Sequence, residues 1–353
     1  MKIQKYLSVC LCATFILIFS FWCLFITTPD YSESERRVLA KFPELTWDSL
    51  WSGEFAKDFE EYTTDRFPTR DTWRSIKAYT RLNLLMQEEN NDIFVNDGHI
   101  GKLEYPMDTK MLDDSISLFS KIQEKHLKDN DVYFAVIPDK NEYIADLKID
   151  YKELENYMYD RLEFATPIHL DELLSAEDYY FTDSHWRQDK ITDVAEHIAK
   201  SMGTDIKSDY EKLTLNIPFK GVYAGQSALK CEPDTITYLT NDTIEGLQVT
   251  GANAVYDMKK ANGKDAYEFF LSGNQPLVKI SNPENKDGKK LIVFRDSFAS
   301  SLMPLMAQGY SEITMIDLRY MNSQFLDQFV DFSESQVLFI YSTNLLNNST
   351  SMK

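Results

Sequence analysis

Two distant parts of the sequence carry residue types that can act together as a nucleophile and its base. The stretch "YYFTDSHWRQDK" (179–190) places Asp183 two residues before His185, and "LIVFRDSFASSL" (291–302) contains Ser297. A serine hydroxyl is a weak nucleophile, so it needs a neighbouring base, which an imidazole held by a carboxylate can supply. The pattern therefore predicts a Ser–His–Asp site if the two stretches meet in space.

Among the five histidines, His185 is the one that follows a carboxylate at this spacing inside a cluster of aromatic residues, Tyr179, Tyr180, Phe181 and Trp186. Side chains two residues apart in an extended segment point to the same side, so Asp183 could hold one ring nitrogen while the other faces Ser297. A turn with a capping Asp and a half-buried histidine explains the same residues equally well. His169, in "ATPIHLDELL", stands where a helix is expected to begin. No second His or Cys stands at ligand spacing, so the sequence predicts no metal and no cofactor.

The surroundings of Ser297 favour a ligand site. It follows a predicted buried strand, "KKLIVF" (289–294), and opens a predicted helix, "SFASSLMPLMAQG" (297–309). In open α/β sheets ligands bind beyond the carboxyl ends of strands, and free N–H groups at a helix start can stabilise an oxyanion. The alternative is that Ser297 or Asp296 only caps the helix, a common use of both residue types.

Strand and helix patterns alternate around these two stretches. Continuous apolar runs are typical of strands buried on both faces, and their alternation with helices predicts an α/β fold with a doubly wound parallel sheet. A break at Pro68 separates two helical patterns, and "NDG" (96–98) predicts a hairpin. The predicted strands are 132–137, 289–294, 312–320 and 335–341, and the predicted helices are near 113–128, 189–203, 297–309 and 322–332.

The first 29 residues predict a membrane anchor. Lys2 and Lys5 precede an uncharged run from Tyr6 to Pro29, and about 20 apolar residues suffice to cross a bilayer as a helix. The basic residues lie before the run, which predicts a single-pass cell-membrane protein with an extracellular C-terminal domain. A cleaved signal peptide is the alternative, although the run is long and no small-residue cleavage site follows it.

Composition and charge limit the remaining possibilities. With 37 Lys+Arg against 56 Asp+Glu in 353 residues, the formal charge of −19 argues against a nucleic-acid partner. Cys231 is the only cysteine beyond the first 29 residues, so that part of the chain can form no intrachain disulfide. The predicted divisions are an anchor at 1–29, a helical extension at 30–90 and an α/β domain at 91–353, with a mainly β or loop insertion at 204–288.

Taken in order, the stretches resemble the DHHW family and its relatives, the alginate O-acetyltransferases of the SGNH hydrolase superfamily. The resemblance implies an SGNH-like, flavodoxin-like core with Ser297 as nucleophile, His185 as general base and Asp183 as orienter, a permuted order in which the serine comes last. It is carried by "SESERRVLAKFP", "FEEYTTDRFPTRD", "AVIPDKNEY", "YYFTDSHW", "DSFASSLMPLM", "IDLRYM" and "VLFIYSTNLL".

Two residues depart from the family pattern. Ser184 stands where the family has its first His, and Arg295 replaces the Gly of "GDS". Gly permits a close backbone approach at such a turn, so Arg295 either binds an anionic group of the acceptor or pairs with a nearby acid. Arg319, expected at the same crevice, either supports the site or pairs with Asp317. The other candidate substrate or oxyanion residues are Tyr320, Trp186, Asn344 and Gly221.

The resemblance implies an O-acyltransferase, by preference an O-acetyltransferase, that modifies a bacterial surface polysaccharide or cell-wall polymer through an acyl-serine. It also implies a partner, a multi-span membrane acyltransferase that delivers the acyl group. Water as the acceptor would make the protein a carbohydrate esterase or deacetylase. The replacement at Arg295 favours a further alternative, a catalytically silent glycan-binding scaffold of a polymer-export complex.

Overall fold

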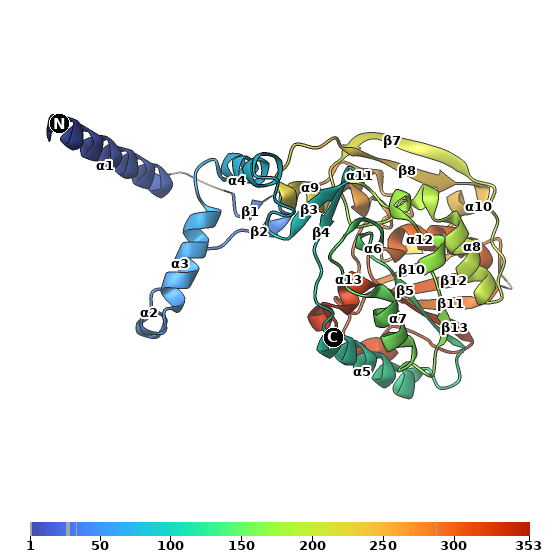
Figure 1. The fold of residues 1–353 in the computed structure, drawn as a ribbon. Helices are drawn as coiled ribbons and strands as arrows, with labels where there is room; N and C mark the ends of the chain where they lie inside the picture. Colours follow the sequence, from blue (N-terminus) through green and yellow to red (C-terminus); the bar gives the residue numbers. More distant parts are fainter. Residues whose placement is uncertain (1, 26–28, 33, 287) are drawn as a thin grey trace. The chain divides into compact units, whose positions relative to one another are not determined.

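The computed structural model describes residues 2–25, 29–32, 34–286 and 288–353. Contacts within the chain divide it into two compact units (Figure 1). The first unit comprises residues 1–90 together with 224–230, and the second comprises 91–223 together with 231–353.

The first unit contains the two predicted helices on either side of Pro68, α3 (Glu54–Asp65) and α4 (Arg70–Tyr79). The carboxylate of Asp65 is buried at the end of α3, where it accepts hydrogen bonds from Arg37 Nη1 at 2.8 Å and from the backbone N–H of Ala40 at 2.9 Å. These contacts hold the segment 37–40 against α3. The other elements of the unit are α1 (Lys2–Phe25), β1 (Tyr31–Ser32), β2 (Arg37–Val38), α2 (Trp47–Ser52) and the π-helical turn η1 (Thr80–Leu84).

Helix α1 coincides with most of the predicted membrane anchor, whose residues 1 and 26–28 lie outside the described ranges. Within those ranges, no helix is both long enough and apolar enough to cross a membrane. This finding contradicts the predicted transmembrane anchor and the single-pass localisation that rested on it.

The second unit is built on a seven-stranded sheet with the order β6-β5-β13-β11-β12-β10-β9. The first five strands of this order are parallel, whereas β10 pairs antiparallel with both of its neighbours, β12 and the edge strand β9. The predicted α/β fold with a parallel sheet is thus confirmed for five strands, whereas the antiparallel strand β10 was not predicted. Its strands are β5 (Val132–Ile137), β6 (Thr166–Ile168), β9 (Gln248–Thr250), β10 (Leu277–Ser281), β11 (Lys290–Arg295), β12 (Glu312–Ile316) and β13 (Ser335–Ser342).

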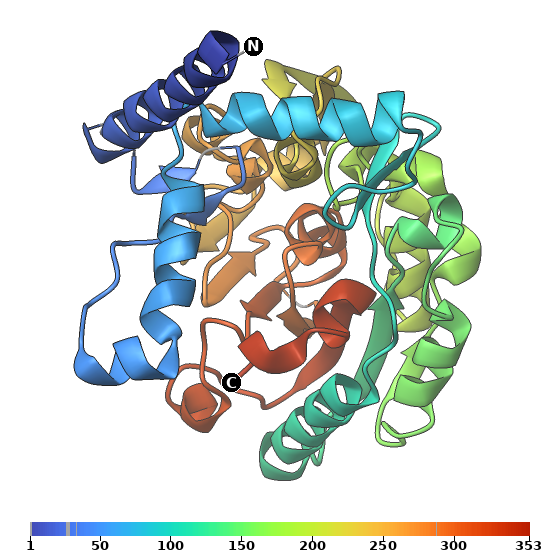
Figure 2. The same ribbon diagram turned by 60° about the vertical axis from the view of Figure 1, so that its left-hand side comes forward.

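Helices cover both faces of this sheet (Figure 1). On one face α8 (Thr192–Ser201) and α12 (Ala299–Met306) share an apolar core with the strands. On the other face the strands share a second core with α5 (Thr109–His126) and α7 (Tyr151–Tyr159). The turned view in Figure 2 shows the red C-terminal segment beside the teal α5, where Ser349 Oγ donates to the carbonyl of Met111 at 2.6 Å.

The chain leaves the neighbouring strands β11 and β13 toward opposite faces of the sheet. Helix α12 follows β11 into one core, whereas Leu345 and Leu346 of α13 (Thr343–Leu346), which follows β13, pack in the other. In open α/β sheets the crevice outside the carboxyl ends of two such strands binds ligands. Ser297 comes two residues after the end of β11, so it lies at this crevice.

The segment 204–288, expected to be mainly strand and loop, takes part in two sheets. It forms the antiparallel pair of β7 (Glu211–Phe219) and β8 (Asp234–Thr240), and it also supplies β9 and β10 to the main sheet. Its short helices are α9 (Val222–Ser227), α10 (Asp242–Glu245), α11 (Met258–Ala261) and the 3₁₀ helix η5 (Ala266–Phe269).

The predicted hairpin and one of the predicted helices have different outcomes. A turn sequence determines the hairpin locally, whereas a helix also needs apolar surface to bury. The predicted hairpin forms between β3 (Ile93–Asn96) and β4 (His99–Lys102). The predicted helix 322–332 is only a 3₁₀ helix, η7 (Ser323–Gln328), because Phe325 and Phe329 are about half exposed and leave it little apolar surface to bury. The remaining short elements are α6 (Asn141–Ile144), η2 (Asp171–Leu173), η3 (Ala176–Asp178), η4 (Gln188–Lys190), η6 (Ala307–Gly309) and η8 (Ser349–Ser351).

Candidate active site

The two stretches that contain Asp183, His185 and Ser297 meet at the carboxyl edge of the sheet. His185 Nε2 lies 2.8 Å from Ser297 Oγ, and His185 Nδ1 lies 2.5 Å from Asp183 Oδ1. Asp183 is fully buried, whereas the side chain of His185 is 13% exposed and Ser297 is partly exposed. The three groups therefore form a continuous hydrogen-bonded chain that runs from the interior to a hydroxyl accessible from outside.

Asp183 and His185 lie in a bend and not in the extended segment that the spacing suggested. Tyr179 and Trp186 pair as an antiparallel bridge, so the chain between them turns back on itself. Asp183 Oδ1 accepts both the backbone N–H of His185, at 3.1 Å, and its ring Nδ1. Asp183 Oδ2 accepts the backbone N–H of Val222 at 2.9 Å. Both carboxylate oxygens thus have donors, which fixes the orientation of the imidazole.

A buried lysine holds the inner side of this bend. Lys140 Nζ donates to three backbone carbonyls, those of Tyr180 at 3.0 Å, Phe181 at 3.2 Å and Asp183 at 2.7 Å. Lys140 is fully buried, and burial lowers the pKa of its ammonium group to about 8. Because it follows β5 by three residues, Lys140 ties the bend to the rigid sheet.

Aspartate Asp234, at the start of β8, holds the outer side of the bend. Its Oδ1 accepts the backbone N–H of Phe181 at 3.0 Å. Its Oδ2 accepts the backbone N–H and the hydroxyl of Thr182, at 2.7 and 2.6 Å. Two regular elements therefore position the residues that carry the carboxylate and the imidazole, as precise chemistry requires.

Aromatic rings enclose the imidazole. The ring of Tyr267 stacks on His185 with centroids 3.8 Å apart and an interplanar angle of 12°. The ring of Phe298 lies 4.9 Å away on a tilted plane. The hydroxyl of Tyr267 lies 2.9 Å from Ser301 Oγ, which also accepts from Trp186 Nε1 at 3.0 Å. These contacts restrict rotation of the imidazole.

Asp296, and not Ser297, supplies the carboxylate that organises the turn between β11 and α12. Asp296 Oδ1 accepts the backbone N–H of Phe298 at 3.0 Å, and Oδ2 accepts that of Ser342, at the end of β13, at 2.8 Å. The N-cap of α12 is Phe298 and no side chain caps the helix, so neither Ser297 nor Asp296 has the capping role that the sequence allowed. This leaves the hydroxyl of Ser297 directed toward His185, near the positive end of the α12 dipole.

Arg295 is fully buried beside the turn, so it cannot reach an anionic group of an acceptor. Its Nη1 lies 3.7 Å from Asp317 Oδ2 and donates to the carbonyl of Asp296 and to Ser300 Oγ, both at 3.2 Å. Arg319 also binds Asp317, through Nε at 2.9 Å and Nη2 at 2.6 Å. Of the two roles that the sequence allowed for each arginine, both Arg295 and Arg319 have the second, an ion pair with a nearby acid, here Asp317.

The remaining candidates occupy different environments. Trp186 is fully buried and donates to the carbonyl of Phe298, so it cannot contact a substrate. The backbone N–H of Gly221 donates to Thr182 Oγ1 at 2.8 Å, so this candidate oxyanion donor already has an acceptor within the protein. Asn344 Nδ2 donates to Glu104, and Tyr320 is 55% exposed next to Arg319.

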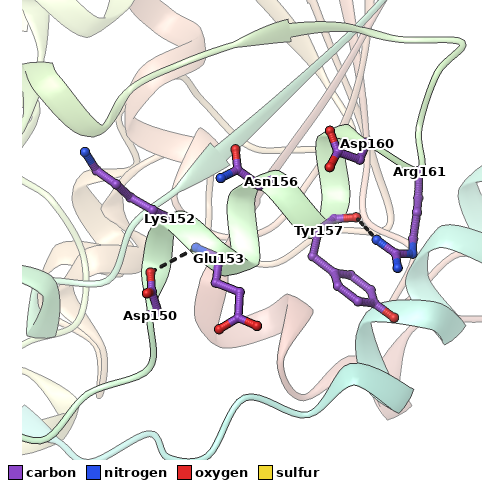
Figure 3. A pocket seen from close by; sticks show the side chains of 7 residues that line it. All are labelled: Asp150, Lys152, Glu153, Asn156, Tyr157, Asp160 and Arg161. Carbon is purple, nitrogen blue, oxygen red and sulfur yellow. Dashed lines mark hydrogen bonds between the residues drawn. The ribbon is translucent and has the colours of Figure 1, made fainter.

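A surface pocket along α7 contains none of these residues. It is lined by charged and polar side chains, and two backbone contacts organise it: Glu153 N donates to Asp150, and Arg161 donates to the carbonyl of Tyr157 (Figure 3). Its lining is that of a solvated helix surface. The full lining is Asp150, Lys152, Glu153, Asn156, Tyr157, Asp160 and Arg161.

Comparisons with known proteins bear on the fold. No protein-family model matches the sequence, and no curated protein matches it. Among solved structures, a DHHW family protein from Eubacterium siraeum covers 74% of this chain and 95% of its own, at 23% identity and a TM-score of 0.63. This chain has that protein's fold. The predicted resemblance to the DHHW family is confirmed in this respect.

Two structures of PatB1 from Bacillus cereus are also similar. Each covers 73% of this chain and 97% of its own at 20% identity, with TM-scores of 0.60 and, for the form with a sulfonyl adduct, 0.59. The O-acetyltransferase domain of Pseudomonas putida AlgJ aligns at 10% identity with a TM-score of 0.46, too low to support an inference about this chain.

Sequence reasoning missed Lys140, Asp234 and Tyr267. Lys140 had a usable signal, because it closely follows a predicted buried strand and therefore belongs to the carboxyl edge where sites form. Asp234 and Tyr267 lie in the segment 204–288, where strand and helix patterns are weak. No local feature separates Tyr267 from the aromatic residues beside it in "DAYEFF".

Proposed function

We propose that this chain is a serine-dependent O-acyltransferase that moves an acyl group, by preference acetyl, onto a hydroxyl of a polysaccharide. The observation that carries the proposal is the hydrogen-bonded chain from Asp183 through His185 to Ser297 Oγ. Nucleophile, base and orienting acid in this geometry are the parts that acyl transfer through a covalent intermediate needs.

In the first half of the reaction His185 Nε2 takes the proton of Ser297 as the hydroxyl oxygen attacks the carbonyl carbon of the acyl donor. The tetrahedral intermediate collapses, the bond to the leaving oxygen breaks, and His185 returns the proton to that oxygen. Asp183 stabilises the imidazolium while it exists. The positive end of the α12 dipole favours the negative charge that develops on the carbonyl oxygen.

In the second half a sugar hydroxyl gives its proton to His185 and attacks the acyl-serine, and Ser297 leaves with that proton. Water in place of the sugar gives an esterase with the same residues, so the acceptor decides between the two activities. The sulfonyl adduct of PatB1, a protein with the same fold, supports a reactive nucleophile in this architecture. The resemblance to the DHHW family predicts that a multi-span membrane acyltransferase supplies the acyl group.

The test is an acetyl-transfer assay with p-nitrophenyl acetate as donor and defined oligosaccharides of surface and cell-wall type as acceptors. Mass spectrometry would measure the acetylated oligosaccharide, and a coupled assay the free acetate. Transfer by the wild type, and its loss in Ser297→Ala but not in His197→Ala on α8, supports the proposal. Acetate release without any acetylated sugar supports the esterase, and no turnover beyond the Ser297→Ala background supports the silent scaffold.

A further inference from the structure

A second group of side chains with ligand chemistry lies away from the residues of the proposed active site. Glu155, His169 and Asp171 each offer one ligand atom, and these atoms all lie within 4.8 Å of one another. The sequence alone predicted no metal site, because no second His or Cys was found at ligand spacing. Folding brings Glu155 to the other two residues.

Two rigid elements produce this arrangement. Glu155 lies in α7, and His169 directly follows β6, the edge strand of the main sheet. Asp171 begins the 3₁₀ helix η2. The ring of Tyr159, also on α7, packs edge-on against His169 with centroids 4.9 Å apart, and its hydroxyl donates to the carbonyl of Ile168 at 3.1 Å. These contacts hold the imidazole close to α7.

Glu155 has a buried carboxylate group whose removal from water is not fully compensated by hydrogen bonds. It is 5% exposed, and its Oε1 has no hydrogen-bond partner among the described residues. A buried carboxylate oxygen without a donor is costly unless a cation meets it.

We propose that Glu155, His169 and Asp171 bind a divalent transition-metal cation, with Zn²⁺ as the best match. One imidazole nitrogen and two carboxylate oxygens are ligands that zinc accepts, whereas Ca²⁺ and Mg²⁺ prefer an all-oxygen shell. Tetrahedral ligands at bond lengths of about 2.0–2.1 Å lie about 3.3 Å apart, so small side-chain rotations close the observed group around an ion.

The ion would fasten the edge of the sheet to the helix that covers it. His169 is exposed and Asp171 partly exposed, so solvent reaches the group and water can fill a fourth position. Binding would cross-link α7 to the end of β6, and a ligand that binds only the folded state stabilises that state. The proposed role is therefore structural, independent of the acyl-transfer chemistry at Ser297.

The test is isothermal titration of the untagged full-length chain with zinc chloride in a non-chelating buffer, paired with thermal unfolding in the presence and absence of the metal. The variants are Glu155→Gln and His169→Ala. Matched controls are Glu153→Gln, an exposed carboxylate on the same helix (Figure 3), and His197→Ala on α8. Circular dichroism of each metal-free variant checks that the fold is retained.

We expect one zinc site in the wild type and in both controls, together with a higher Tm when zinc is present. Glu155→Gln and His169→Ala should weaken binding at least about tenfold and remove the rise in Tm, since each deletes a ligand. Calcium and magnesium should produce neither effect. Equal zinc affinity in all five proteins, or no zinc binding by the folded wild type, would overturn the proposal. Neither result would bear on the acyl-transfer activity, which is measured separately.

Discussion

The ring of Tyr267 lies parallel to the imidazole of His185, with the two centroids 3.8 Å apart. Tyr267 is buried, and its hydroxyl reaches Ser301 on α12, the helix that begins just after Ser297. One side chain thus contacts both the proposed base and the helix next to the proposed nucleophile. We interpret Tyr267 as a positioning residue, because it reaches the reacting atoms only through His185.

Removing this ring should slow the reaction. In Tyr267→Leu the imidazole loses its stacking surface, and misplacement of a catalytic group by about 1 Å can cost on the order of 10²-fold in rate. We expect kcat for acetyl-ester turnover to fall by about 10 to 100-fold. Tyr267→Phe is the control: it keeps the ring, loses only the hydroxyl contact to Ser301, and should keep most of the activity. A loss as large in Tyr267→Phe would mean that the hydroxyl, and not the stacking, is what matters.

The carboxylate of Asp183 should be essential although it never touches a substrate. Asp183→Asn keeps the size of the side chain but cannot stabilise an imidazolium or hold the required tautomer, and the equivalent change in a serine protease costs about 10⁴-fold in kcat. We expect a loss of about 10³ to 10⁴-fold with little change in KM. Steady-state kinetics measure this. A fall below tenfold would remove Asp183 from the proposed mechanism.

Gly221 should tolerate no side chain, since it packs against the bend that carries Asp183. A Cβ at Gly221 would lie 2.3 Å from both the carbonyl oxygen of Thr182 and the Cβ of Asp183. Gly221→Ala must therefore displace the bend, and we expect a loss of about 1–3 kcal/mol in unfolding free energy together with reduced activity. The control is Gly246→Ala, where the nearest atom is 3.4 Å away. Denaturant unfolding curves of the two variants should differ clearly; similar curves would contradict this packing argument.

Glu104 should make stability depend on pH. Burial, and next the nearby Asp139, raises the pKa of Glu104 to about 8, well above the usual value near 4.3 in the unfolded chain. Between these two values the folded state binds more protons than the unfolded state. This contribution to stability is therefore fully present below about pH 4.3 and is lost as the pH rises through about 8.

The isosteric change Glu104→Gln imitates the protonated side chain and removes its titration. We expect the decrease in Tm between pH 5 and pH 8 to be smaller in Glu104→Gln than in the wild type, and unchanged in the exposed control Glu153→Gln. Differential scanning calorimetry at both pH values measures this. Identical pH dependence in Glu104→Gln and the wild type would show that Glu104 does not titrate in this range.

The parts of the site that sequence could predict are those with a strong local pattern. The Asp-x-His spacing and the strand–serine–helix stretch made Asp183, His185 and Ser297 candidates, and the buried strand β11 explains why Ser297 stands at the sheet edge. The alternation of apolar strands and helices likewise predicted the parallel part of the sheet. These features depend on short segments whose chemistry is visible in the sequence itself.

The sequence could not predict which side chains are buried by distant segments or which distant residues they contact. Trp186 was a candidate substrate or oxyanion residue, yet its ring packs in the interior against Phe298. Arg295 looked available to an acceptor, and only the structure shows Asp317 beside it. The first 29 residues matched an anchor by composition, which the described helices contradict. The outcomes for Trp186 and Arg295 depend on partners far away in the sequence.

The central claim is that Ser297 Oγ is a nucleophile activated by His185. Phenylmethylsulfonyl fluoride attacks such a hydroxyl, and peptide mass spectrometry locates the sulfonyl group after digestion. We predict one adduct, on the peptide that contains Ser297, which forms at least about 100-fold more slowly in His185→Gln and is missing in Ser297→Ala. Labelling elsewhere in the chain, or labelling of Ser297 at the same rate without His185, would contradict the account.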